Sequence, residues 1–202
     1  ELEPLWEELK RVVKDRAAIV LFAQTPFDKV LGVSNLSMLR YEWIWEKTSA
    51  TGHLNAKRMP MKAHENVLVF YKKLPVYNPQ KTIGHVRKTS TRNGVDYQSE
   101  CYGKQGKKSF YDSTERYPRS VQIFSSDKQK KPLHPTQKPE ALLEYIVKTY
   151  SDEGDLVLDF CMGSGTAGVA AKRVNRRFIG FEKEPLYFDV AKARIGAVEV
   201  VG

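Results

Sequence analysis

The chain has 202 residues, and 33 Lys and Arg against 24 Asp and Glu give it a formal net charge of +9. This length is sufficient for one domain with a buried core and a sizeable insertion. The two cysteines, Cys101 and Cys161, are too few for a disulfide framework, and neither they nor the histidines have the spacing of a metal site. No apolar run is long enough to span a bilayer, and the first residues do not have the pattern of a signal peptide. We therefore expect a soluble intracellular protein with no membrane segment and no metal.

The first 71 residues have the pattern of alternating helix and strand. Six apolar residues recur at helical spacing between Leu2 and Val13, and the apolar run at 17–23 predicts a short buried strand. Two further strands are expected at 41–47 and 66–71. Trp43 and Trp45 lie on one face of the first of these two strands, which favours a place in the core over a stacking platform.

The excess positive charge lies in one segment, residues 72–131. This segment holds fourteen Lys and Arg against five acidic residues, a surplus of nine, so the rest of the chain is neutral. Tyr and Phe stand there among Gly, Ser, Thr, Asn and Gln, a mixture that offers phosphate contacts, stacking faces and hydrogen bonds to bases. A solvated loop is the alternative. The composition favours an inserted nucleic-acid-binding region.

Regular periodicity returns after the basic segment. It predicts a helix from Pro139 to about residue 151, a strand at 155–160, a helix from about 167, a strand at 177–182 and a helix at 186–195. This order predicts an α/β fold, a Rossmann-like, largely parallel and doubly wound sheet with helices on both faces. The expected organisation is a first core segment at 1–71, the basic insert at 72–131 and a second core segment at 132–202.

A nucleoside site is expected where these strands end. Asp159 ends one strand, Gly163 and Gly165 allow a ligand to approach the backbone closely, and Glu182 ends the next strand, where an acid can accept both hydroxyls of a ribose. A tight strand-to-helix turn with no ligand is the alternative. Neither a Walker loop nor the dinucleotide fingerprint is met. S-adenosylmethionine, which has no phosphate and carries positive charge, fits these residues better.

Three segments resemble one known family. Residues 134–139 (HPTQKP), 156–166 (LVLDFCMGSGT) and 178–182 (FIGFE) look like the C-terminal part of a β-class DNA amino-methyltransferase, while 19–27, 41–47 and 64–73 look like the phage-type adenine enzymes. The family order of catalytic half, recognition region and cofactor half is also the order here. Asp159-Phe160-Cys161 departs from the usual Asp-Pro-Phe, and Ala167 stands where a second Thr is common.

The resemblance implies that this is an S-adenosylmethionine-dependent fold acting on double-stranded DNA in a bacterial or phage-infected cell. Its cofactor residues would be His134, Thr136, Gln137, Lys138, Asp159, Phe160, Cys161, Gly163, Ser164, Gly165, Thr166 and Glu182. Its DNA-binding residues would be Lys57, Arg58, Lys62, His64, Arg87, Lys88, Arg92, Lys104, Lys107, Lys108, Arg116 and Arg119. Cys161 is expected to be a small buried residue and not a nucleophile.

The family's catalytic signature is a polar residue followed by Pro-Pro-Tyr or Leu-Pro-Tyr, and it does not occur in the chain. The segment at 74–77 (LPVY) lacks the polar first residue. We expect the signature upstream of Glu1 and this chain alone to be inactive, within a site-specific enzyme that methylates the exocyclic amine of a flipped base, adenine in preference to cytosine. A non-catalytic DNA-binding module, or a methyltransferase of RNA or protein, is the alternative. A homodimer and a restriction endonuclease partner are compatible with the resemblance, and the sequence tests neither.

Overall fold

The computed structural model of the chain describes residues 2–92, 97–99, 103–105, 108–126 and 133–199. It divides into two compact units, Glu1–Asn78 with Arg119–Gly202 (the core unit) and Pro79–Pro118 (the insert unit). The insert unit is narrower than the segment 72–131 expected from charge, because the residues that flank it pair and pack within the core unit.

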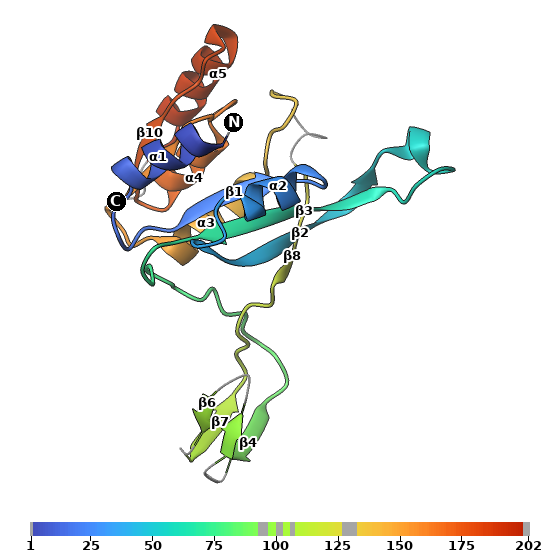
Figure 1. The fold of residues 1–202 in the computed structure, drawn as a ribbon, viewed down its shortest axis with the longest axis vertical. Coiled ribbons are helices and arrows are strands. Elements are labelled where there is room, and N and C mark those ends of the chain that lie inside the picture. Colours follow the sequence, from blue (N-terminus) through green and yellow to red (C-terminus); the bar gives the residue numbers. More distant parts are fainter. Residues whose placement is uncertain (1, 93–96, 100–102, 106–107, 127–132, 200–202) are drawn as a thin grey trace. The chain divides into compact units, whose positions relative to one another are not determined.

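The core unit contains a four-stranded sheet in the order β1-β3-β2-β8 (Figure 1). Its strands are β1 (Ile19–Ala23), β2 (Leu39–Thr51), β3 (Lys62–Phe70) and β8 (Val121–Phe124). β3 is antiparallel to both β1 and β2, whereas β8 is parallel to β2. The pattern had not indicated β8, and β2 is longer at both ends than expected.

Both faces of this sheet are covered, which explains the unbroken apolar run in β3. Val67 and Val69 pack with residues of α3 (Glu140–Tyr150) and α4 (Thr166–Arg173), while Leu68 and Phe70 pack with α1 (Glu3–Val12) and α2 (Phe27–Val33). Successive side chains of a strand point to opposite faces, so one strand contributes to two core clusters. The helix α2 was not expected, because seven residues carry too short a pattern.

The second core segment forms a parallel pair of strands between helices. β9 (Leu156–Asp159) pairs in parallel with β10 (Arg177–Gly180), and α4 and α5 (Pro185–Gly196) follow these strands. Gly168 of α4 allows close helix packing, since a Cβ there would lie 2.4 Å from Ile195 Cδ1. Ala167 and Ala170 of α4 belong to the same buried cluster as the tryptophans of β2, so this segment shares the core of the first.

The α/β class with parallel crossover strands is confirmed at β9 and β10, but the first core segment is a mixed sheet. β2 and β3 are joined through a hairpin that includes a short 3-10 helix, η1 (His53–Asn55), and a hairpin connection can only join antiparallel strands. The expected parallel arrangement therefore does not hold for β1, β2 and β3.

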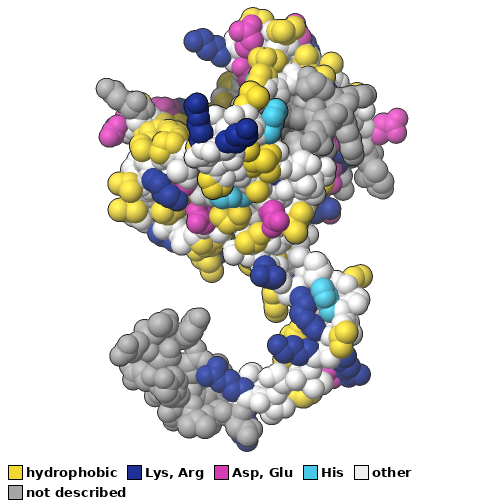
Figure 2. All heavy atoms as spheres, turned by 90° about the vertical axis from the view of Figure 1, so that its right-hand side faces the viewer, with side chains coloured by type: hydrophobic (Ala, Val, Ile, Leu, Met, Phe, Trp, Pro, Cys, Tyr) yellow, Lys and Arg dark blue, Asp and Glu magenta, His cyan; other side chains and the backbone are white. Residues whose placement is uncertain are grey.

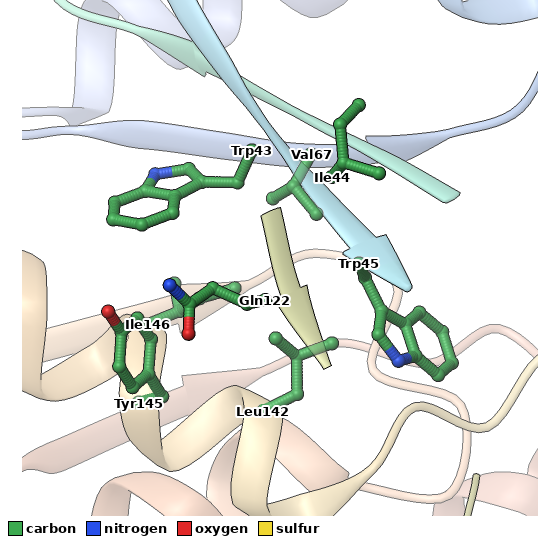
Figure 3. Close-up of a pocket in the computed structure, with 8 residues that line it drawn as sticks. All are labelled: Trp43, Ile44, Trp45, Val67, Gln122, Leu142, Tyr145 and Ile146. Atoms are coloured by element: carbon green, nitrogen blue, oxygen red, sulfur yellow. The ribbon is translucent and has the colours of Figure 1, made fainter. Parts of the chain in front are cut away.

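Trp43 and Trp45 are buried in the core, as predicted. Together with Leu142, Tyr145 and Ile146 of α3 they line a small pocket (Figure 3). Trp43 Nε1 donates a hydrogen bond of 2.6 Å to Tyr150 Oη, while Tyr145 Oη is buried without a partner and burial raises the pKa of Tyr145 to about 12. Because the lining is almost wholly apolar, we interpret the pocket as a gap in the packing between the sheet and α3.

The insert unit is built from antiparallel pairs. β4 (Lys88–Arg92) pairs with β7 (Ser109–Ser113), β5 (Tyr97–Ser99) pairs with β6 (Gly103–Gln105), and Thr82 and Arg116 form an isolated bridge. The sequence pattern had not indicated these strands, because short polar strands leave no apolar alternation. Among the described residues no helix is long and apolar enough to cross a membrane.

Candidate functional site

Asp159 and Glu182 lie at the same edge of the β9-β10 pair. Asp159 ends β9 opposite Gly180, and Glu182 follows two residues after β10. Glu182 Oε1 accepts a hydrogen bond from Glu184 N (3.0 Å) and Oε2 accepts one from Gly163 N (2.8 Å). These backbone donors, Glu184 first, hold the pKa of Glu182 below its usual value. The carboxylate is thus ionised and fixed against the glycine turn.

Asp159 is in a different environment. Burial raises the pKa of Asp159 and the charge of Glu182 raises it further, against a 3.1 Å hydrogen bond that Oδ1 accepts from Cys161 N. The neighbouring carboxylates of Asp159 and Glu182 make this end of the strand pair electronegative. A ligand with a positive charge near Asp159 would relieve the cost of burying it.

The glycine turn is covered by the segment that contains His134. Gly163 has φ +51°, and a Cβ built on it would lie 3.2 Å from the His134 ring. Gly165 has φ +76°, and its Cβ would lie 2.8 Å from Ala191. Positive φ and close approach both favour glycine at these two positions. His134 also contacts the Tyr187 ring edge-on, with centroids 4.2 Å apart.

Internal hydrogen bonds fix the segment 133–138. Gln137 is buried, and its Oε1 accepts a hydrogen bond from Leu133 N at 3.1 Å. Thr136 N donates to His134 Nδ1 at 3.2 Å, and the Thr136 hydroxyl lies 3.1 Å from the same nitrogen. Thr136 therefore orients the imidazole, while Gln137 holds the backbone of the segment through Leu133 and His134.

A buried ion-pair cluster joins the two core segments. Glu65 at the start of the apolar stretch of β3 forms ion pairs of 2.7 Å with both Lys138 and Lys47, and its side chain is 10% exposed. Lys138 Nζ also lies 5.3 Å from the centroid of the Phe22 ring, within cation–π range. Burial alone would raise the pKa of Glu65, but the bonds and charges of Lys138 and Lys47 outweigh it and the pKa is lowered.

Sequence reasoning placed Lys138 at the site but missed Glu65 and Lys47. It also missed Asp28, which is buried and accepts a 2.6 Å hydrogen bond from Asn66 Nδ2. A signal for Glu65 was present, since an acid two residues before the continuous apolar run 67–70 must find a partner when the strand is buried.

Ser164 and Thr166 are 2% and 5% exposed, so both residues are buried within the glycine turn and the start of α4. Arg194 donates to Ser164 O (2.5 Å) and to Glu140 Oε1 (2.6 Å), which ties the turn to α5 and α3. Phe160 and Cys161 are exposed. The expectation of a buried Cys161 was wrong, because the residue lies just past the end of β9. Desolvation and the nearby carboxylates raise its pKa to about 11, so the thiol stays protonated at neutral pH.

The residues expected to bind DNA fall into two groups. Lys57, Arg58, Lys62 and His64 are all exposed on the β2-β3 connection of the core unit, and Arg119 is exposed where the chain re-enters that unit. In the insert unit Lys88, Arg92 and Lys108 are exposed. Lys107 lies outside the described residues, as does the side chain of Lys104.

Two of the expected DNA-binding residues have structural partners in the insert unit. Arg87 forms a two-pronged pair with Asp112 (2.7 and 2.5 Å) that links the ends of β4 and β7. Arg116 donates to the carbonyls of Val86, Ser113 and Glu115. In the described part of the chain no group of three or more His, Cys, Asp and Glu is placed to hold a metal.

Comparisons with known proteins point to one family. A family model described as DNA methylase matches residues 1–193. The type II methyltransferase M.HinfI of Haemophilus influenzae is 30% identical over 203 residues, which are 96% of this chain and 51% of that protein. M2.DpnII of Streptococcus pneumoniae is 55% identical over 64 residues, which are 32% of this chain and 24% of that protein. The chain spans about half the length of M.HinfI.

Solved structures show the same fold. The M1.HpyAVI–SAM complex superposes with a TM-score of 0.67 at 27% identity, over 93% of this chain and 78% of that one. The cytosine-N4-specific PvuII DNA methyltransferase gives a TM-score of 0.69 over 100% of this chain and 72% of that one, at 16% identity, which is likeness of fold alone.

Glu65→Gln should lower the free energy of unfolding at pH 7 by about 3–5 kcal/mol, because two lysines would lose the charge that compensates their burial. Because folding lowers the pKa of Glu65, its ion pairs stabilise the protein fully above the pKa of the unfolded state, near 4.5. This stabilisation is lost as the pH falls through the pKa of the folded state. Urea unfolding of both proteins should thus show a gap that closes below about pH 4.5. Glu8→Gln, which breaks an exposed pair with Arg11, is the control and should change nothing measurable. A gap of constant size down to pH 3 would contradict this role.

Proposed function

The chain belongs to the DNA methylase family, and we propose that it forms the cofactor-binding and DNA-binding part of an S-adenosylmethionine-dependent methyltransferase that acts on double-stranded DNA. The observation that carries the proposal is the close approach of His134 to Gly163 beside Asp159 and Glu182. This arrangement combines an open backbone turn with two carboxylates at the carboxyl ends of parallel strands, where α/β folds bind nucleosides.

The residues fit S-adenosylmethionine better than a phosphate-bearing cofactor. Its ribose hydroxyls would donate hydrogen bonds to Glu182. The Glu182 carboxylate is ionised and already accepts hydrogen bonds from backbone N–H groups. Its positive methionine end would lie near Asp159, where burial and Glu182 together disfavour an unpaired charge. When bound, the cofactor supplies an activated methyl group. The contribution of the chain is to hold and orient it, since fixing two reactants in attack geometry is worth roughly 7–11 kcal/mol.

We propose an exocyclic base amine as the acceptor, with adenine preferred over cytosine. The support is the likeness of residues 19–27, 41–47 and 64–73 to the adenine enzymes. The polar residue of the family signature, which would accept hydrogen bonds from the amine, does not occur in these 202 residues. On this proposal another segment supplies it, and the chain by itself does not methylate. Without that residue a flipped base has no specific binding site.

The sheet edges support an additional strand. Among the described residues β1 pairs only with β3 and β9 pairs only with β10. On β9, Leu156 and Leu158 are 51% and 37% exposed. An unpaired edge strand with exposed apolar side chains is normally covered by another element. A strand that carries the missing signature would bring the acceptor residue to the cofactor edge.

Two alternatives stay open to test, a DNA-binding module with a residual cofactor pocket and a methyltransferase of RNA or protein. The type II relatives favour a cognate restriction endonuclease as a second component in the cell. A homodimer stays a prediction that sedimentation would decide.

Mass spectrometry of nucleosides from the nucleic acids, and of amino acids from the protein mixture, tests the proposed activity. Duplex DNA, RNA and a protein mixture would be incubated with S-adenosylmethionine and either the 202 residues or the protein expressed from its natural start codon. We expect N6-methyladenine only in DNA and only with the second protein. Detection of N4-methylcytosine would show that cytosine, not adenine, is the acceptor base. No methylated product with either protein would favour the binding module.

Glu182→Ala should weaken binding of S-adenosylmethionine by roughly 1.5–3 kcal/mol, the value of hydrogen bonds to a charged group. Glu184→Ala is the matched control. The control removes a neighbouring acid and keeps the backbone N–H that Glu182 accepts from, so its affinity should not change. Isothermal titration calorimetry of the three proteins would decide the matter, and equal affinities would remove Glu182 from the site.

The double variant Lys88→Ala/Lys108→Ala should lower the salt dependence of DNA affinity by about 0.9 per phosphate contact, so by roughly 2 in the slope of log K against log salt. Lys10→Ala/Lys14→Ala removes the same charge from the exposed side of the core unit near α1 and should leave the slope as it is. Fluorescence anisotropy over a range of salt concentrations measures both. Equal slopes for the two double variants would remove the insert from the DNA interface.

A further inference from the structure

The connection between β2 and β3 is a protruding hairpin with no core of its own. Every residue from 48 to 64 is exposed, and we name this segment the arm. The regular pairing of β2 with β3 ends at Glu46 and His64, and after an irregularity Thr51 pairs with Lys62, so the arm projects from the sheet as a hairpin (Figure 1). Gly52, at φ +90°, begins the turn at its tip.

The arm combines positive charge with exposed apolar side chains. Lys57, Arg58 and Lys62 lie on it, and residues 48–64 contain no Asp or Glu. Leu54, Met59 and Met61 are 88%, 51% and 40% exposed. From the side towards which the arm projects, cationic, histidine and hydrophobic side chains lie close together on the core unit, with some acidic side chains among them (Figure 2). Such a surface fits a partner that is strongly anionic and also offers apolar faces.

The arm begins beside the candidate cofactor site. β1 and β2 are both antiparallel to β3, so the carboxyl ends of β1 and β2 lie at the same end of the sheet. The arm leaves the sheet from that end. His64 is the last residue of the arm, and the next residue, Glu65, holds Lys138 of the segment that covers the glycine turn. A DNA target presented to the cofactor would therefore lie within reach of the arm.

We propose that the arm is a wedge that enters duplex DNA at the place vacated by the target base. Its cations hold the backbone, and Leu54 and Met59 at its tip occupy the opened base step. The proposal rests on the proposed function and adds to it the means by which the extruded state is held.

The chemistry of an opened duplex matches the arm. Extruding a base costs a few kcal/mol and exposes the faces of its neighbours to water, and apolar side chains inserted between base steps offset that cost. Methionine suits an irregular gap because its side chain is unbranched and polarizable. A fully paired duplex presents only phosphates and groove edges, which the cations alone could contact. The apolar tip therefore implies a preference for DNA that is already open.

The test uses the 202-residue chain and requires neither methylation nor a known recognition sequence. Anisotropy would compare a duplex that contains one abasic site with the fully paired duplex of the same sequence. We expect the abasic duplex to bind about tenfold more tightly. Leu54→Ser/Met59→Ser should abolish this preference and keep the salt slope. Lys57→Ala/Arg58→Ala should weaken binding to both duplexes, lower the salt slope and keep the preference.

Val30→Ser/Val33→Ser, at exposed positions of α2, is the matched apolar control and should keep both the preference and the slope. A chain that binds DNA without preferring the abasic duplex, or a preference that survives in Leu54→Ser/Met59→Ser, would overturn the wedge. Sedimentation that shows a dimer lost in that variant would assign the tip to self-association and also overturn it. A chain that binds neither duplex would contradict the proposed function itself.

Discussion

The ion-pair cluster around Glu65 is the interaction on which the site depends. Lys47 and Lys138 come from segments about ninety residues apart in sequence, and one buried carboxylate holds both. Because an unpaired charge at this depth would cost several kcal/mol, the cluster favours the arrangement in which the two segments meet. Lys138 in turn continues the segment whose His134 lies against Gly163. The position of the glycine turn relative to β3 thus follows from an electrostatic requirement.

The same constraint places the arm. Glu65 must be buried to meet its lysines, whereas His64, one residue earlier, is exposed. The boundary between core and arm is therefore sharp, and the hairpin starts beside the candidate cofactor site. The insert unit is a separate compact body whose basic residues serve partly for its own folding, as Arg87 and Arg116 show. Charge in this chain thus joins segments internally, and in the function we propose it also meets an anionic partner.

The sequence allowed β9, α4, β10 and α5 to be predicted almost to their ends, because glycines and apolar periodicity mark them. It did not reveal β8, since four residues in a basic stretch become a strand only by pairing with β2. Nor did it reveal Glu65 as a partner of Lys138, because 73 residues separate them and a buried ion pair leaves no periodic signal. Ser164 and Thr166 are buried beside Arg194 of α5, a neighbour that the local pattern did not indicate. Local pattern identifies elements, whereas long-range contacts decide which side chains a site presents.

A crystal structure of the chain grown with S-adenosylmethionine would test the central claim most directly. The account predicts the nucleoside between the His134 segment and the glycine turn, with the ribose hydroxyls on Glu182 and the positive end near Asp159. The pair of Glu65 with Lys138 should be unchanged, because it sets the frame and is not part of the ligand shell. A ligand bound elsewhere, such as between Trp43 and Tyr145, or a bound cofactor with that ion pair broken, would contradict the account.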